Sequence, residues 1–518
     1  MPRKSKKPAT PTFALSRTRI LCVIAVVVFL SAALPVIDHY WPYRYRNVMP
    51  TLQTVFASKI KIDHYHRIYL PHPGFIADGI VLRRNSALNL PPVGSVDHIR
   101  VEGRWIDLLL FRNRIWLVRA QGLHVIVPPV GSEANHQDFP AGSANDFTGP
   151  TTAVETLDLD NTTLDILRVG GGKYSFPIRS LVIRNLQKNK AIEFDVDMLN
   201  AKPTGHIQAH GTFGPLLADK LGDTPVTGQF TFTDVKLSDI GGISGGLTSK
   251  GSFHGSLTEI EVTADSNIPD FAVGNAQPTS ISATSSGAVN ALNGDVLLHA
   301  VDVHIARSTL HVQGSIAGAP KQTVLDLSVN NGRVQDILHP FLNNPSPIAG
   351  PVQLHAHTVL APGSKGATFL QRLKMDGSFE VPTERLTNPT TAQKLTAFSE
   401  RAQGLPSPPP DSPTVDVLSS LSGSVHIQNG VAHASRLDFE LPGASVQVSG
   451  TYDLRSQTAN LQGDVRMQAD ISHVTTGFKS ALLKPLAPMF KKKHAGAVVP
   501  IAITGKSGNF KIGQNILR

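Results

Sequence analysis

The sequence predicts a mainly β protein: a long curved antiparallel sheet that forms an apolar-lined trough, with an N-terminal transmembrane helix and a few short helices. Composition points the same way, because 43 Gly, 37 Pro and a charged fraction of only 17% among 518 residues describe a turn-rich folded chain. Its frequent Val, Ile and Thr favour strands. The alternation of apolar and polar residues predicts the two faces of the sheet, and a recurring glycine predicts its curvature.

Apolar residues alternate with polar ones from position 60 onward, most clearly between Gly423 and Leu454. Asn429-Gly430 and Pro442-Gly443 interrupt this stretch as turns, so it predicts successive hairpins with one apolar and one wetted face. The residues expected on the apolar face are Val425, Ile427, Leu437, Phe439, Leu441, Val446 and Val448.

A glycine followed by a small or polar residue and then an apolar one recurs along the chain. It stands at Gly211, Gly228, Gly251, Gly314, Gly377, Gly423, Gly450 and Gly463, at irregular spacing. The repeat is therefore a degenerate supersecondary unit rather than a strict solenoid period. Glycine at such a position allows a bulge or a tight corner, and many bends of one sense curl a long sheet into a trough.

The N-terminal region is basic and then apolar. Eight basic residues and one acid lie within residues 1–46, which leaves 40 of the 48 basic and 38 of the 39 acidic residues for the rest of the chain. The net charge of +9 therefore belongs to the N-terminal tail, and no nucleic-acid-binding face is predicted. Residues 20–37 are uncharged and long enough to cross most of a bilayer core of about 30 Å.

We expect residues 1–19 to be a cytoplasmic tail and residues 20–37 a single transmembrane anchor, with the body outside the cytoplasm. Basic residues before the apolar run and aromatic residues after it, beginning with Tyr40 and Trp41, fit this orientation. A cleaved signal peptide with Ser31 and Ala33 at the small-residue positions is the alternative. The one cysteine, Cys22, lies inside the apolar run, so the body has no disulfide and no thiol-based site.

Two stretches break the strand pattern. Residues 392–402 have apolar side chains at helical spacing, and the proline-rich residues 405–414 predict a stiff linker. Residues 475–493 form an amphipathic segment that Pro485 and Pro488 interrupt and that ends in three consecutive lysines. The linker separates a central β trough at 151–404 from a C-terminal β region at 415–518, and an N-terminal β region at 38–130 precedes the trough.

The stretch GFKSALLKPLAPMFKKKHAGAVVPIAITGKSGNF, together with LDFELPGASVQVSGTYDL before it, carries a motif of spaced Gly, Leu, Lys, Pro and Phe residues. Its members are Gly477, Phe478, Leu483, Lys484, Pro485, Phe490, Gly496, Pro500 and Gly505. This region resembles the AsmA-like (AsmA/TamB-like) family of envelope proteins, and so do the stretches YLPHPGFIADGIVLRR and GRVQDILHPFLNNPSPIAGPVQLHA. The family pattern often has a proline just before its final aromatic residue, where this chain has Ser507-Gly508-Asn509 before Phe510.

The resemblance implies a bacterial inner-membrane protein whose curved sheet projects into the periplasm, similar to bridge-like lipid-transfer proteins. It implies that phospholipid is bound or conducted between the inner and outer membranes, so the seven residues of the apolar face are candidate lipid contacts. Lys491, Lys492 and Lys493 are expected to contact a membrane or an envelope protein at the C-terminal end. The alternative for this segment is a simple cap on the end of the sheet.

The sequence gives little support to an enzyme, and no cofactor or metal is expected. His64 and His66 alternate on an expected strand, as do His355 and His357, but solvated strand positions explain them better than a metal site. No nucleophile elbow, metalloprotease helix or paired-carboxylate cluster is present. Two other functions remain: a scaffold or assembly factor for envelope proteins without lipid carriage, and a β-helical polysaccharide-binding or hydrolytic protein, which an aromatic content of 6% disfavours.

Overall fold

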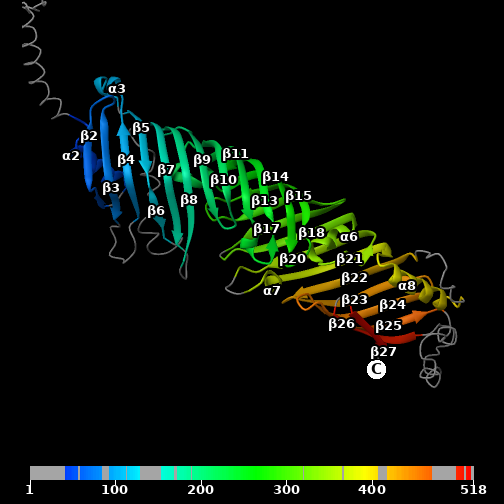
Figure 1. Ribbon diagram of the computed structural model, residues 1–518. Helices are drawn as coiled ribbons and strands as arrows, with labels where there is room; N and C mark the ends of the chain where they lie inside the picture. Colours follow the sequence, from blue (N-terminus) through cyan, green and yellow to red (C-terminus); the bar gives the residue numbers. More distant parts are fainter. Residues whose placement is uncertain are drawn as a thin grey trace, which may run out of the picture.

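The computed structural model describes residues 41–56, 59–83, 93–112, 114–128, 153–167, 172–187, 189–318, 320–363, 367–405, 417–468, 498–506 and 509–514. Strands dominate these residues and join into one long, mostly antiparallel sheet with a few short helices, which confirms the prediction of a mainly β chain. Figure 1 shows the strands side by side along an elongated molecule, with the first strands at one end and the last at the other.

The elements fall into three consecutive groups. The first comprises α2 (Tyr45–Phe56), β1 (Lys59–Lys61), β2 (His64–Ile68), β3 (Gly74–Arg83), β4 (Gly94–Glu102), α3 (Trp105–Leu109), β5 (Arg114–Gln121), β6 (His124–Val127), β7 (Ala153–Leu167) and β8 (Lys173–Leu186). The second comprises β9 (Ile192–Ala201), β10 (Thr204–Phe213), η1 (Ala218–Asp223), β11 (Pro225–Lys236), η2 (Leu237–Ile240), β12 (Ile243–Ser244), β13 (Gly246–Ser256), β14 (Glu259–Val273), β15 (Thr279–Val289), β16 (Val296–Ile305) and β17 (Ser308–Ala317). The third comprises β18 (Gln322–Arg333), α6 (Val334–Leu338), η3 (His339–Phe341), β19 (Ile348–Ala349), β20 (Pro351–Leu360), α7 (Phe369–Arg372), β21 (Leu373–Leu386), α8 (Pro389–Ala402), β22 (Ser419–Gln428), β23 (Val431–Leu441), β24 (Ala444–Asp453), β25 (Thr458–Met467), β26 (Val498–Lys506) and β27 (Asn509–Gln514).

Strand pairing follows the sequence. From β7 onward each long strand pairs antiparallel with the long strand before it, so neighbours in the sequence are neighbours in the sheet. The expectation of a fully antiparallel sheet is wrong at one place, because β5 and β6 both pair parallel with β7. β7 begins long after β6 ends, and a parallel crossover needs such a separation.

Several of the short helices lie along one rim of the sheet, which we call the helical rim. η2, α6 and α8 follow β11, β18 and β21, whose C-terminal ends reach this rim, and α8 confirms the helix predicted at 392–402. The strand register shifts beside these insertions, between Phe232 and Val235 in β11 and between Val329 and Gly332 in β18. A bulge bends a strand, and here the bends enclose Val235, Val329 and Val381, each 0% exposed.

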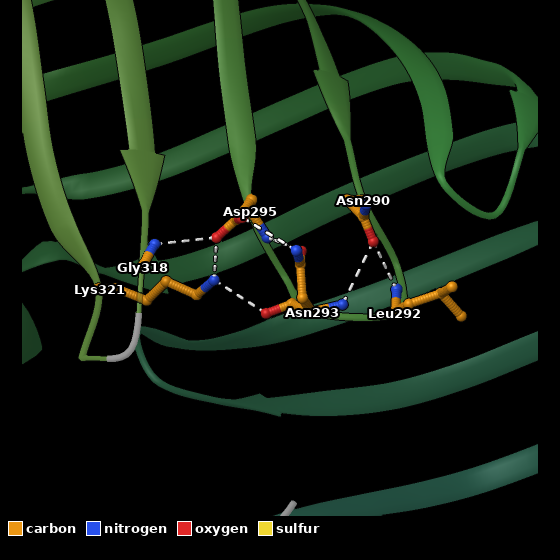
Figure 2. Close-up of polar contacts among 6 residues, drawn as sticks. All are labelled: Asn290, Leu292, Asn293, Asp295, Gly318 and Lys321. Atoms are coloured by element: carbon orange, nitrogen blue, oxygen red, sulfur yellow. Dashed lines mark hydrogen bonds and ion pairs between the residues drawn. The ribbon is translucent and has the colours of Figure 1, made fainter. Parts of the chain in front are cut away.

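Hydrogen-bonded hairpin turns lie along the opposite rim, which we call the turn rim. Lys321 of the β17–β18 turn pairs with Asp295 of the β15–β16 turn, and the same carboxylate accepts the backbone N–H of Gly318 at 3.1 Å (Figure 2). The backbone N–H of Ala291 in turn donates to the carbonyl of Leu257, in the β13–β14 turn, at 2.8 Å. These bonds fix successive hairpins to one another at their tips.

Several predicted segments lie outside the described residues: the anchor at 20–37, positions 406–414 of the linker, and the amphipathic segment at 475–493. In the part of the chain that the structure describes, no helix has the length and apolarity to cross a bilayer. β21 and β22, which precede and follow the linker, pair directly over most of their length. The sheet therefore continues across the boundary that the sequence predicts.

Candidate functional site: the apolar face of the sheet

One row of residues can be followed across the sheet through the strand register. Partner residues on paired strands point to the same face. The row comprises Ala77, Ile99, Ala120, Leu159, Leu181, Val196, Ala209, Phe230, Gly251, Ala264, Ser285, Val301, Val312, Leu327, Ala356, Gly377, Val425, Ala434, Gly450, Leu461 and Ile503. It contains no charged residue, and Ser285 is its only hydroxyl. The sheet therefore presents one continuous apolar face from β3 to β26.

A neighbouring row, offset by one residue, points to the opposite face and is polar. It comprises Gln313, Asp326, His357, Asp376, His426, His433, Thr451, Asn460 and Thr504. A one-residue offset puts the apolar row and the polar row on different faces, because side chains of successive strand residues point to opposite faces.

The seven residues predicted for the apolar face do lie together on it. Val425 belongs to the apolar row, and Ile427 lies two residues further along β22, opposite Met375 of β21. The other five pair among themselves or with an apolar partner on β23 and β24: Leu437 with Val448, Phe439 with Val446, and Leu441 with Ala444. Contact between these residues and lipid stays a prediction.

Helices cover the apolar face at both of its ends. Val48 and Met49 of α2 pack against the first strands, in a core that contains Phe75 and Ala77. At the other end Leu395, Phe398 and Ala402 of α8 pack in a core with Leu441, Ala444, Val448, Val465, Met467 and Ile501. A third core lies at the helical rim, where α6 packs against β18, β20 and β21.

The middle of the apolar face has no such cover among the described residues. The three cores contain no residue of β9 to β16. Large apolar side chains of these strands are neither buried nor fully exposed, namely Phe194, Val196, Met198, Ile207, Phe230, Phe232, Phe253 and Val262. Phe230 and Phe253, with ring centroids 6.5 Å apart, lie on adjacent paired strands. The apolar face is therefore partly exposed across these strands, and helices cover it at its two ends.

The eight recurring glycines all lie on the apolar face. Their register partners are apolar or glycine, such as Phe379 and Leu437 for Gly423. A Cβ added at Gly463 would lie 1.9 Å from the carbonyl oxygen of Gln447, and one at Gly211 would lie 2.1 Å from that of Thr227. At these two positions any side chain would collide with the neighbouring strand, so glycine is required there.

Cross-strand pairs of histidine and aspartate recur on the sheet, and three of them lie on the polar side of β16 to β22. The Nδ1 atoms of His311, His357 and His426 lie 2.7, 2.7 and 2.6 Å from carboxylate oxygens of Asp302, Asp326 and Asp376, their direct register partners. The hydrogen bond that the His426 ring makes to the Asp376 carboxylate raises the pKa of His426. Further pairs are Asp78 with His98, Asp165 with His124, and Asp197 with His206.

Two carboxyl groups are buried for different reasons. Asp165 is 1% exposed and accepts hydrogen bonds from Lys173 at 2.6 Å and from His124 at 2.8 Å. Burial opposes ionisation, but these partners outweigh it and lower the pKa of Asp165 to about 2. Glu384 is also 1% exposed, at the helical rim, and burial raises its pKa because its one hydrogen bond within the described residues comes from Ser419 at 3.2 Å.

Of the predicted C-terminal motif, the structure describes Pro500 and Gly505. Both lie on β26, where Pro500 faces Asp464 and Gly505 faces Ala459. The remaining motif residues lie outside the described residues, as do Lys491, Lys492 and Lys493. The grouping of the motif therefore stays a prediction.

The histidines predicted as weak metal candidates are strand residues. His64 and His66 lie on β2, and His355 and His357 lie on β20. In the described part of the chain, no group of three or more His, Cys, Asp or Glu side chains could hold a metal ion. Sequence reasoning missed the histidine–aspartate pairs, because Asp376 and His426 are far apart in the chain and only the strand register joins them.

Known proteins give no identification. No protein-family model matches the chain, and a comparison with curated proteins finds no match either.

Proposed function

We propose that the chain is a membrane-anchored, non-enzymatic envelope protein whose sheet curves into an apolar trough. The trough binds acyl chains of phospholipids and conducts these lipids between the inner and outer membranes, in support of outer-membrane biogenesis and integrity. The observation that carries the proposal is the continuous apolar face, which is packed under helices at its ends and uncovered across β9 to β16.

The energetics of the uncovered stretch favour a lipid occupant. Each buried CH₂ group contributes about 0.8 kcal/mol, so an acyl chain laid along several strands gains many times the thermal energy. Soluble monomers rarely leave a contiguous apolar patch of more than a few hundred Å² exposed without using it to bind something. Phe230, Phe232 and Phe253 lie together on such a surface.

The shape follows from the glycines. All eight lie on the apolar face, and at Gly211 and Gly463 a side chain would collide with the neighbouring strand, which favours bends of one sense. Repeated bends toward the apolar face make that face concave, and a concave apolar surface encloses more of a bound chain than a flat one. The helical rim and the tied hairpins of the turn rim support the two long sides.

The membrane placement rests on the sequence. The uncharged residues 20–37 follow a basic tail, and the resemblance to the AsmA-like family implies a periplasmic body. No catalytic group or cofactor is required, since movement along a uniform apolar surface involves no change of covalent bonds.

A matched pair of variants tests acyl-chain binding where the face is uncovered. Phe230→Asp places a charge on the apolar face of β11, and Gln229→Asp places the same charge on the polar face one residue away. We expect full-length Phe230→Asp protein, purified in mild detergent, to lose most of the phospholipid that mass spectrometry detects with the wild type. Gln229→Asp should keep it. Burial of an unpaired charge against hydrocarbon is costly, whereas a solvated charge is not.

A second readout separates lipid loss from misfolding. Circular dichroism and limited proteolysis report whether Phe230→Asp remains folded. A photo-crosslinking amino acid at position 230 should give phospholipid adducts in cells, and one at position 229 should not. Equal adducts at both positions, or none at 230 in a folded protein, would contradict the trough and favour a scaffold without lipid carriage.

A further inference from the structure

The exposed apolar side chains of the N-terminal end gather at one corner of the sheet. Leu70 is 78% exposed, Leu109 71% and Phe111 95%, and Ile106 and Leu110 are each more than half exposed. We call these five residues the corner patch. They belong to the β2–β3 turn and to α3 with the residues after it, at the turn rim, where Figure 1 shows α3 at the extreme end of the molecule.

Aromatic contacts join the two halves of the corner patch. The indole N–H of Trp105 in α3 donates to the carbonyl of Pro71 in the β2–β3 turn at 3.2 Å. Trp41 contacts both halves of the patch: its ring centroid lies 4.8 Å from that of Tyr69, beside Leu70, and 5.6 Å from that of Trp105 in α3. Trp41 is only 3% exposed. The patch is therefore one surface on a packed aromatic base.

The aromatic residues of this corner have the chemistry of a membrane interface. All three tryptophans of the chain belong to this corner, since Trp116 lies on β5 soon after α3. The guanidinium carbon of Arg104 lies 5.7 Å from the centroid of the Trp116 ring. Trp and Tyr concentrate at the boundary between lipid headgroups and hydrocarbon, where an apolar ring and a polar N–H or O–H are both satisfied. The exposed Arg112 and Arg114 next to the patch suit anionic headgroups.

The chain itself brings this corner to a membrane. Trp41 follows the predicted anchor at 20–37 by only a few residues, so the aromatic base is tethered close to the bilayer surface. A protein partner would have to displace a bilayer that is already in reach. The occupant with the strongest support is thus the membrane that holds the anchor.

We infer that the corner patch inserts shallowly into the outer leaflet of that same membrane. Leu109, Leu110 and Phe111 enter the hydrocarbon boundary while the arginines stay at the headgroups. Insertion holds the first strands of the sheet against the bilayer, so that the apolar face starts where lipids can leave the leaflet. The inference rests on the anchor and the lipid-binding role of the proposed function.

Site-specific labelling of the full-length protein tests the insertion. Cys22→Ser removes the one native thiol, after which Phe111→Cys or Gln447→Cys provides a single site for the fluorophore NBD. The protein is reconstituted in vesicles of phosphatidylethanolamine and phosphatidylglycerol. We expect NBD at position 111 to be quenched by lipids with a nitroxide near the headgroup, and several-fold less by aqueous iodide than NBD at position 447.

The outcomes distinguish this inference from the proposed function. Iodide quenching at position 111 equal to that at 447 overturns insertion, and so does protection from both quenchers, which would indicate a protein over the patch. Co-purified phospholipid is measured separately on the same samples. Insertion without co-purified phospholipid would contradict lipid binding by the trough and support the membrane contact of the corner patch. Co-purified phospholipid without insertion would support the trough and contradict the membrane contact.

Discussion

At the scale of single residues, the glycines of the apolar face have the clearest physical role. Their alternation with apolar side chains could be predicted from the sequence, because strand periodicity is a local signal. Their common face could also be anticipated. The closeness of the facing carbonyls could not, since it depends on how strongly each strand pair bends.

We predict that Gly463→Ala destabilises the C-terminal end of the sheet. The new Cβ would lie 1.9 Å from the carbonyl oxygen of Gln447, so β24 and β25 must separate, at a cost of about 1–3 kcal/mol. Thermal unfolding and hydrogen exchange in β24 to β26 measure the effect. Gly513→Ala is the control, because its Cβ would meet no atom within 4 Å and stability should hardly change.

Glu384 predicts a pH dependence of stability. Burial raises the pKa of its carboxyl above the value in the unfolded chain. The free energy of unfolding is therefore highest below the unfolded pKa and falls as the pH rises through the folded pKa, because the folded state resists ionisation. Glu384→Gln should remove this decline and raise the melting temperature at pH 7 relative to the wild type, with a smaller difference near pH 4.

The exposed Glu380 on the same strand provides the control for that experiment. Glu380→Gln should leave the slope of melting temperature against pH unchanged. A wild-type slope in the Glu384→Gln variant would show that other groups produce the dependence.

At the scale of elements, α8 shows what sequence can and cannot predict. The spacing of Leu395, Phe398 and Ala402 predicts an amphipathic helix, and the structure has one from Pro389 to Ala402. The apolar stripe indicates that one face of the helix is buried, but it does not identify the strands that bury it. Its partners lie on β23 to β26, and only the sheet register brings them under the helix.

We predict that Ser399→Ala loosens α8 from the sheet. The Ser399 hydroxyl is 1% exposed and donates to the carbonyl of Pro442, in the β23–β24 turn, at 2.6 Å. Loss of that bond leaves only the longer contact from the Gln403 side chain, at 3.5 Å, on the same carbonyl, at a cost of about 0.5–1.5 kcal/mol. Hydrogen exchange in α8 should increase while exchange in β9 to β16 stays the same. Unchanged protection of α8 would indicate that the apolar contacts alone hold it.

The parallel pairing of β5 and β6 with β7 is an element-scale failure of the sequence reasoning. Alternation specifies which face of a strand is apolar but carries no information on the direction of its neighbour. The long stretch of sequence between β6 and β7 was the available signal for parallel pairing. A hairpin connects its strands by a short turn, whereas a parallel crossover needs a long connection.

At the scale of the whole molecule, the C-terminal lysines test whether the far end meets a second membrane. Lys491→Glu, Lys492→Glu and Lys493→Glu together should leave the sheet folded, because consecutive lysines are expected to be solvated and solvated lysines add little to stability. Each lysine near an anionic surface contributes about 1 kcal/mol, so the triple variant should bind anionic vesicles at least tenfold more weakly. The assay measures capture of such vesicles by protein reconstituted in a first, neutral population. Undiminished capture would favour a simple cap.

Sequential pairing also determines the order in which the sheet can assemble. Among the described strands after β7, each long strand pairs with the long strand before it, and the short β12 and β19 pair with a strand later in the chain. A chain delivered from its N-terminus can therefore add one long strand at a time, and most additions close only a short loop. The edge that receives each new strand moves forward with synthesis or export as far as β27, the last described strand. An interruption at any point would leave a shorter sheet with the same kind of edge, rather than an unfolded remainder waiting for its missing half.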